Sequence, residues 1–133
     1  MRKILVMIKP DVYDKEREWL KNVELEKVIR GKVIDLFWNP IYDKVLELND
    51  EDIKAIYREH VWKDFYWRLN DSMKWRVTAM IFEIEENELS FADLIDIKSN
   101  IRDTYSLWLA RNTIHISSSI EDAEFETGYF LKK

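Results

Sequence analysis

The residue with the clearest chemical potential is a histidine near the carboxyl end of the chain. His115 lies between two isoleucines, and serines occupy positions 117–119 directly after them. This order predicts an apolar strand that gives way to a helix N-terminus, where free backbone amides favour anions. A neutral imidazole is nucleophilic near pH 7, so His115 could carry an anionic group. An isolated histidine more often only packs and hydrogen-bonds, so its neighbours must decide.

Those neighbours resemble the nucleoside diphosphate kinase family. The segment Arg111–Ser119 reproduces that family's histidine segment almost residue for residue, and Met7–Asp11 matches its first strand and Lys-Pro-Asp turn. Further matches are segment 31–37, the ten-residue spacing from Arg102 to Asn112, and the register of Ala123 and Glu126. Matches at both ends, in the right order, make coincidence a poor explanation.

The resemblance implies a two-step exchange of phosphate between nucleotides. The histidine would attack the terminal phosphate of a nucleoside triphosphate, carry it, and give it to a nucleoside diphosphate. Mg²⁺ would bridge the phosphates and arrive with the nucleotide, so we expect no dedicated metal site in the protein. A homo-oligomer is also implied, although the family's usual hexamer is not presumed.

The resemblance also implies roles for individual side chains. Lys9 would donate to the sugar hydroxyl and the transferred phosphate, Arg102 would hold phosphate oxygens, and Asn112 would contact the sugar. Tyr57 would lie beside the histidine and Phe65 against the base. Taken singly, each has a plain structural alternative, such as a solvated turn lysine or a surface ion pair.

A carboxylate and a hydroxyl complete the expected site. Glu126 lies far enough into the last helix to reach the far imidazole nitrogen and orient His115, and Ser117 would support that carboxylate. The alternative is that Glu126 lies on an exposed helix face.

The sequence departs from the family pattern in three places. The stretch from Glu83 to Arg102 is short and lacks the arginine and threonine that usually grip phosphate, leaving Lys98 and Ser99 as substitutes. Ser118 stands where the family has an aspartate. The charged segment Tyr13–Arg30 is extra, and it would form a helical cover, an oligomer contact or a lid.

The elements that must position these residues follow from apolar periodicity. We expect strands over 3–8, 41–48, 77–84 and, interrupted at 111–112, over 105–116. Helices are expected over an amphipathic stretch ending at 39–40 that Gly31 would divide, over 50–60 with a cap at 49–50, over 89–97, and from Ser119 until Gly128 ends it. Ser119 and Asp122 partly imitate a capping box. This order contains the βαββαβ core of a ferredoxin-like α+β sandwich with an antiparallel sheet and additional helices.

Composition limits the remaining possibilities. The 133 residues, 47% of them hydrophobic, suit one domain over 1–133 with a single sizeable core. The net charge of −5 argues against general nucleic-acid binding. The chain has no cysteine and no apolar run approaching the ~20 residues of a membrane span, so we expect a soluble, cytoplasmic protein.

Two other functional classes stay open. The missing phosphate-gripping pair would also suit a nucleotide-binding or interaction module that has lost efficient transfer. A ferredoxin-like regulatory domain for another small ligand is the third possibility, and it would gain if Lys9 and His115 lay on opposite faces.

Overall fold

A computed structural model of the chain describes residues 2–9, 22–58, 76–85, 89–105 and 114–132. Four strands form one antiparallel sheet in the order β2-β3-β1-β4. The strands are β1 (Arg2–Ile8), β2 (Tyr42–Glu47), β3 (Arg76–Ile84) and β4 (Ile114–Ile116). The helices are α1 (Asn22–Phe37), α2 (Asp50–Ile56), α4 (Phe91–Tyr105) and α5 (Ile120–Leu131). The predicted α+β class and βαββαβ order are confirmed, with α2 and α5 as the additional helices.

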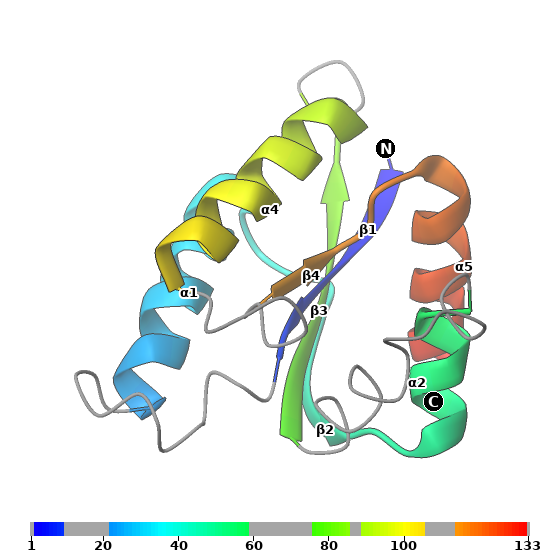
Figure 1. Cartoon of the computed structure of the whole chain (residues 1–133). Helices are drawn as coiled ribbons and strands as arrows, with labels where there is room; N and C mark the ends of the chain where they lie inside the picture. Colours follow the sequence, from blue (N-terminus) through cyan, green and yellow to red (C-terminus); the bar gives the residue numbers. More distant parts are fainter. Residues whose placement is uncertain (1, 10–21, 59–75, 86–88, 106–113, 133) are drawn as a thin grey trace.

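The two central strands are buried on both faces of the sheet. Every side chain from Ile4 to Ile8 has no exposed surface, and the same holds from Val77 to Phe82. Helices α1 and α4 cover one face and α2 and α5 cover the other (Figure 1). Alternate residues of each strand therefore enter different cores, one built around Ile29, Val33 and Leu94 and the other around Ile53, Tyr57 and Phe130.

Both glycines lie inside helices, contrary to the sequence-based expectation. Gly31 does not divide α1, which runs unbroken to Phe37, and Gly128 does not end α5, which continues to Leu131. A helical glycine costs about 1 kcal/mol relative to alanine, whereas burying one large aliphatic side chain contributes roughly 1.5–3 kcal/mol. The buried Ile29 and Val33 on either side of Gly31 outweigh its cost.

Two other boundaries also differ from the prediction. Helix α4 extends past Ile97 to Tyr105, so residue 105 belongs to a helix. The described part of the last expected strand is Ile114–Ile116, and positions 106–113 lie outside the described residues. Helix α2 ends at Ile56, and positions 59–60 of the expected helix lie outside the described residues. Asn49 begins α2 with a complete capping box, as its side chain accepts from the Asp52 amide at 2.8 Å and the Asp52 carboxylate accepts from the Asn49 amide at 3.1 Å.

Helix α1 ends in an unusual backbone conformation. Trp38, the first residue after the helix, has φ of 72° and donates its amide to the Ile34 carbonyl at 2.8 Å. Glycine usually fills this left-handed position because other residues are strained there. The indole is 81% exposed.

No helix of the described residues is long and apolar enough to cross a membrane.

Candidate active site

Strand β4 directs His115 to the face of the sheet that α2 and α5 cover. It is an edge strand that pairs antiparallel with β1, and His115 lies opposite Met7. Ile114 and Ile116 are fully buried in the core on the α1 and α4 side. Because side chains alternate along a strand, the histidine between them points the other way.

A buried chain of hydrogen bonds holds the histidine ring. Nε2 of His115 lies 3.0 Å from Oε2 of Glu126, which comes from α5 and is 2% exposed. The Ser117 hydroxyl donates to Oε1 of the same carboxylate at 2.8 Å and accepts from the Leu5 amide at 3.0 Å. The backbone of β1 thus fixes Ser117, Ser117 fixes Glu126, and Glu126 fixes the ring. The three residues expected to act together lie together.

This arrangement decides which ring nitrogen can react. An ionised carboxylate only accepts hydrogen bonds, so Nε2 of His115 must donate and therefore carries the hydrogen. In the neutral ring the other nitrogen, Nδ1, then holds the lone pair. With the described residues, Nδ1 forms no hydrogen bond. The arrangement therefore leaves Nδ1 as the ring nitrogen of His115 whose lone pair is available to a ligand.

His115 lines a polar pocket of about 160 Å³ between α2, α4, β4 and α5. The charged residues around it are Arg58, Lys98, Arg102, Asp122 and Glu126. Whole-ligand pockets usually measure roughly 300–1,000 Å³, so this volume suits a phosphate group better than an entire nucleotide. A small pocket that combines a nucleophile with several cations can hold and receive a phosphoryl group.

Lys9 and Tyr57 lie on the same side of the sheet as the histidine. The rings of Tyr57 and His115 meet edge to face, with centroids 5.7 Å apart and 72° between their planes. The Lys9 ammonium lies 5.5 Å from the Tyr57 ring centre and the residue is 2% exposed, so it is not a solvated turn lysine. The opposite-face arrangement that would have favoured an unrelated regulatory domain is therefore not observed.

Helix α4 contributes two cations, one turn apart, to the pocket. Arg102 donates from Nε and Nη2 to the Ile114 carbonyl, at 3.1 and 3.0 Å, and so ties α4 to the edge strand. Lys98 is partly buried, and this burial lowers its pKa from the ordinary value of 10.5. The positive charge of Arg102 lowers it further, while Glu126 and then Asp122 oppose the shift.

Comparison with known proteins identifies the family at this point. The model of a family described as "Nucleoside diphosphate kinase" matches residues 2–133. The chain belongs to the nucleoside diphosphate kinase family. It is 33% identical to the nucleoside diphosphate kinase of Methanocaldococcus jannaschii over 134 aligned positions, covering 90% of this chain and 95% of that protein. The resemblance to this family is confirmed, and the chain is an enzyme of the phosphotransferase type.

Solved structures of nucleoside diphosphate kinases share the fold. The apo structure from Encephalitozoon cuniculi superposes with a TM-score of 0.72 at 19% identity, covering 100% of this chain and 90% of that chain. The Aquifex aeolicus enzyme gives a TM-score of 0.70 at 22% identity, covering 97% and 94%. At these identities the likeness supports the fold alone.

The sequence did not indicate that Arg58, just after α2, and Asp122 of α5 form a charged pair in this pocket. Arg58 lies 3.2 Å from the Asp122 carboxylate and stacks over Phe125, with its guanidinium 4.0 Å from the ring centre. Asp122 also accepts from the Ser118 hydroxyl at 3.2 Å. Ser119 accepts from the Asp122 amide as expected, but the Asp122 carboxylate faces Arg58 and Ser118, so the capping box is half formed. The only signal in the sequence was that Arg58 directly follows Tyr57, which was expected to lie beside His115.

Several expected site positions lie outside the described residues. Phe65 and Asn112 are among them, and so is the first part of the Tyr13–Arg30 segment, whose second part begins α1. Of the two suggested substitutes for the missing phosphate ligands, Lys98 lines the pocket, whereas Ser99 is exposed. Among the described residues, no group of three or more acidic or histidine side chains could hold a metal ion.

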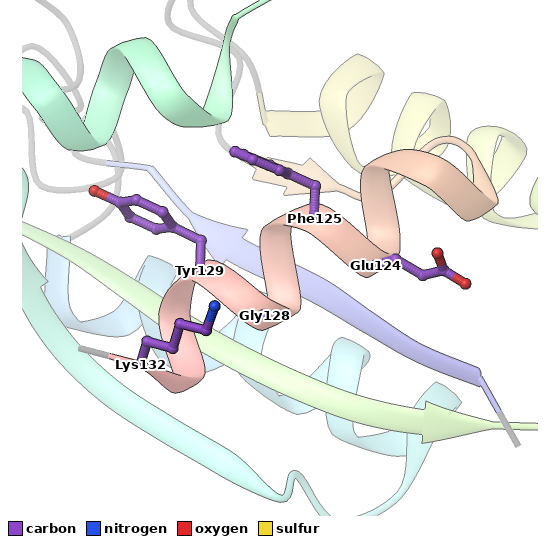
Figure 2. A pocket seen from close by; sticks show the side chains of 5 residues that line it. All are labelled: Glu124, Phe125, Gly128, Tyr129 and Lys132. Atoms are coloured by element: carbon purple, nitrogen blue, oxygen red, sulfur yellow. The ribbon is translucent and has the colours of Figure 1, made fainter.

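A larger hollow, of about 490 Å³, lies elsewhere along α5 and is lined by Glu124, Phe125, Gly128, Tyr129 and Lys132. Figure 2 shows the rings of Phe125 and Tyr129 extending from α5 toward α2. They stack with centroids 6.3 Å apart, and the Tyr129 hydroxyl donates to Asp52 of α2. His115 does not line this hollow, which makes the smaller pocket the better site for chemistry despite its size.

Proposed function

We propose that the chain moves the terminal phosphate of a nucleoside triphosphate to a nucleoside diphosphate through a phosphohistidine at His115. The observation that carries the proposal is the 3.0 Å contact between Nε2 and the buried Glu126, which leaves Nδ1 as the nitrogen able to attack. Family membership supports the same reaction.

In the first step the Nδ1 lone pair of His115 forms a bond to the terminal phosphorus. The bond from that phosphorus to the bridging oxygen breaks, and the nucleoside diphosphate leaves with the electron pair. The ring becomes positively charged when its second nitrogen bonds phosphorus, and the Glu126 carboxylate at Nε2 balances that charge. A nucleoside diphosphate then takes the phosphoryl group by the reverse of these bond changes, and Nδ1 regains its lone pair.

Other side chains have supporting roles in this proposal. Arg102 and Lys9 provide positive charge for phosphate oxygens, and Lys9 also donates to the sugar hydroxyl. Tyr57 borders the histidine. The expected contacts of Phe65 with the base and of Asn112 with the sugar are part of the same proposal. Positioning and charge stabilisation are what phosphoryl transfer mainly needs. Stacking on an aromatic ring would accept any base, because each base has a π face.

Mg²⁺ fits the proposal as an ion that comes with the nucleotide. It prefers oxygen ligands, keeps several waters and commonly binds through substrate phosphates with one or two carboxylates. Of the described carboxylates that line the pocket, Asp122 best suits the role of an oxygen ligand to this ion, although Arg58 and Ser118 also contact it. When bound, Mg²⁺ would neutralise negative charge on the phosphate oxygens.

The proposal extends to organisation and location. We place the chain as one catalytic domain over residues 1–133, in the cytoplasm where its nucleotide substrates are, without a nucleic-acid or membrane partner. A homo-oligomer is supported by exposed apolar side chains where α1 ends and edge strand β2 follows, namely Leu36, Trp38, Ile41 and Val45.

Incubation with γ-labelled ATP tests the covalent step. Wild-type protein should acquire acid-labile, base-stable phosphate and release it to added GDP, and His115→Ala should acquire none. Lack of label on the wild type, or label retained by His115→Ala, would exclude the phosphohistidine mechanism. Tight nucleotide binding without transfer of phosphate from ATP to GDP would instead favour a binding module that has lost transfer.

A further inference from the structure

The cations around the His115 pocket differ in what already holds them. Nε and Nη2 of Arg102 donate to the Ile114 carbonyl. Arg58 is paired with Asp122 and stacked on Phe125. Lys98 lines the same pocket, yet with the described part of the chain its ammonium forms no hydrogen bond or ion pair. Among the described cations of the pocket, Lys98 is therefore the one whose N–H donors are available to a ligand.

The position of Lys98 also suits a ligand with several negative charges. It lies four residues before Arg102, so the two side chains are neighbours on one face of α4. The buried residues Leu94 and Ile101 fix the orientation of this helix against the core. Two partly buried cations side by side repel each other and lose hydration, and a polyanion between them relieves both costs.

We infer that Lys98 is a phosphate ligand of this pocket, donating from Nζ to the non-bridging oxygens of the phosphoryl group that His115 accepts and returns. This inference rests on the proposed function. Lys98 keeps its proton throughout, because only the bonds of phosphorus to Nδ1 and to the bridging oxygen form and break. An ammonium at this place strengthens its contacts as charge develops on the oxygens in the transition state.

The inference explains how the chain tolerates its short Glu83–Arg102 stretch. A lysine on a helix, held by packing, supplies the positive charge that the missing arginine would supply from a loop. Ser99, one position on, is exposed and does not line the pocket, so it has no part in this role.

A dependence on pH follows from the surroundings of Lys98. Its neighbours in the pocket are Arg102 of α4, Asp122 and Glu126 of α5, His115 of β4, and Tyr57 and Arg58 after α2. Its pKa is lowered from 10.5, first by burial and then by Arg102. Phosphate binding by the ammonium should therefore decline at a less alkaline pH than an exposed lysine would allow. An arginine stays charged over this range.

Three variants test the role of Lys98: Lys98→Met, Lys98→Arg and the control Lys54→Met, which removes an exposed lysine from α2. Single-turnover labelling with γ-labelled ATP should be slowed about 10²–10³-fold in Lys98→Met, the loss typical of one transition-state donor. Calorimetry should show about tenfold weaker binding of ATP to the same variant, with adenosine binding unchanged. Lys98→Arg should restore much of both, and should keep ATP binding at alkaline pH where the wild type loses it.

The binding arm separates this inference from the proposed function. If wild-type protein forms no phosphohistidine, the proposed function fails, yet a selective loss of ATP affinity in Lys98→Met would still support the phosphate ligand. If the wild type is labelled and Lys98→Met labels and binds ATP as Lys54→Met does, the inference about Lys98 is overturned while the function stands. Equal losses for ATP and adenosine would also overturn it, because they would indicate a general effect on the fold.

Discussion

The two oxygens of the Glu126 carboxylate have different partners, His115 and Ser117, and both were expected in the active site. One oxygen faces the His115 ring and the other accepts the Ser117 hydroxyl, in surroundings that leave the residue 2% exposed. A buried carboxylate without such donors would be costly. The same hydrogen bonds that offset the cost of burying Glu126 therefore fix the tautomer of His115.

Replacing Glu126 by glutamine should slow phosphorylation of His115 without unfolding the protein. The amide can still accept from Nε2 and donate to the Ser117 hydroxyl, but the negative charge is lost. A hydrogen bond to a charged group contributes about 1.5–3 kcal/mol, which corresponds to roughly ten- to a hundredfold in rate. Single-turnover labelling, with thermal unfolding as a check on the fold, measures this effect.

Glu124→Gln is the matched control on the same helix. Glu124 is exposed and pairs with Arg2 rather than with the site, so its variant should label at the wild-type rate. A Glu126→Gln protein that labels as fast as the Glu124→Gln control would contradict the orienting role.

At this scale the sequence predicted residues that belong to motifs and missed residues that only the fold brings together. His115, Ser117 and Glu126 are near in sequence, so the family resemblance and the helical register together predicted that they meet, and their contacts are observed. Arg58 and Asp122 are 64 positions apart and meet because α2 and α5 share a face of the sheet. No local pattern encodes such a pair.

Helices α2 and α5 are joined by a side-chain link near the second hollow. Asp52 completes the capping box of α2 with one oxygen and accepts the Tyr129 hydroxyl of α5 with the other. Desolvation raises the pKa of Tyr129 to about 12, and the hydrogen bond to Asp52 and its negative charge add to the shift. Since α2 leads directly to Tyr57 and Arg58, this link helps to place one wall of the His115 pocket.

The link should make stability sensitive to alkaline pH. The folded state holds the Tyr129 proton more tightly than the unfolded chain, so its contribution is complete below pH 10 and is lost as the pH rises through about 12. Urea unfolding midpoints should therefore fall more steeply over this window in the wild type than in Tyr129→Phe. Tyrosinate absorbance should show one late titration that the variant lacks. Identical slopes would exclude the effect.

Element boundaries were the weakest part of the sequence prediction, and packing explains why. Gly31 was predicted to divide a helix and Gly128 to end one, yet both helices continue because residues on both sides of each glycine reach the core. Helix α1 ends at Phe37, and Trp38 directly after it is a residue type that does not favour the left-handed conformation it adopts. The two central strands were easier to predict, because strands buried on both faces are continuous apolar runs.

The two edges of the sheet have different surroundings in the whole molecule. At the β4 edge, Arg102 of α4 binds the outward Ile114 carbonyl and α5 supplies the partners of His115. At the β2 edge, Val45 is 52% exposed and Ile41, just before the strand, is 48% exposed. An edge strand flanked by exposed apolar side chains tends to associate with another copy or partner.

Charges placed at the β2 edge should therefore lower the oligomeric state without removing the chemistry. In light scattering, Val45→Lys and Trp38→Lys should give a smaller particle than the wild type, because each buries a charge in an apolar contact. Ile95→Lys is the control, since Ile95 is similarly exposed at 43% but lies on α4. The sheet order places β3 and β1 between this edge and His115, so both variants should still form phosphohistidine. A wild-type monomer would contradict the proposed homo-oligomer. Unchanged mass in both β2-edge variants, with a change in Ile95→Lys, would indicate that the contact does not lie at this edge.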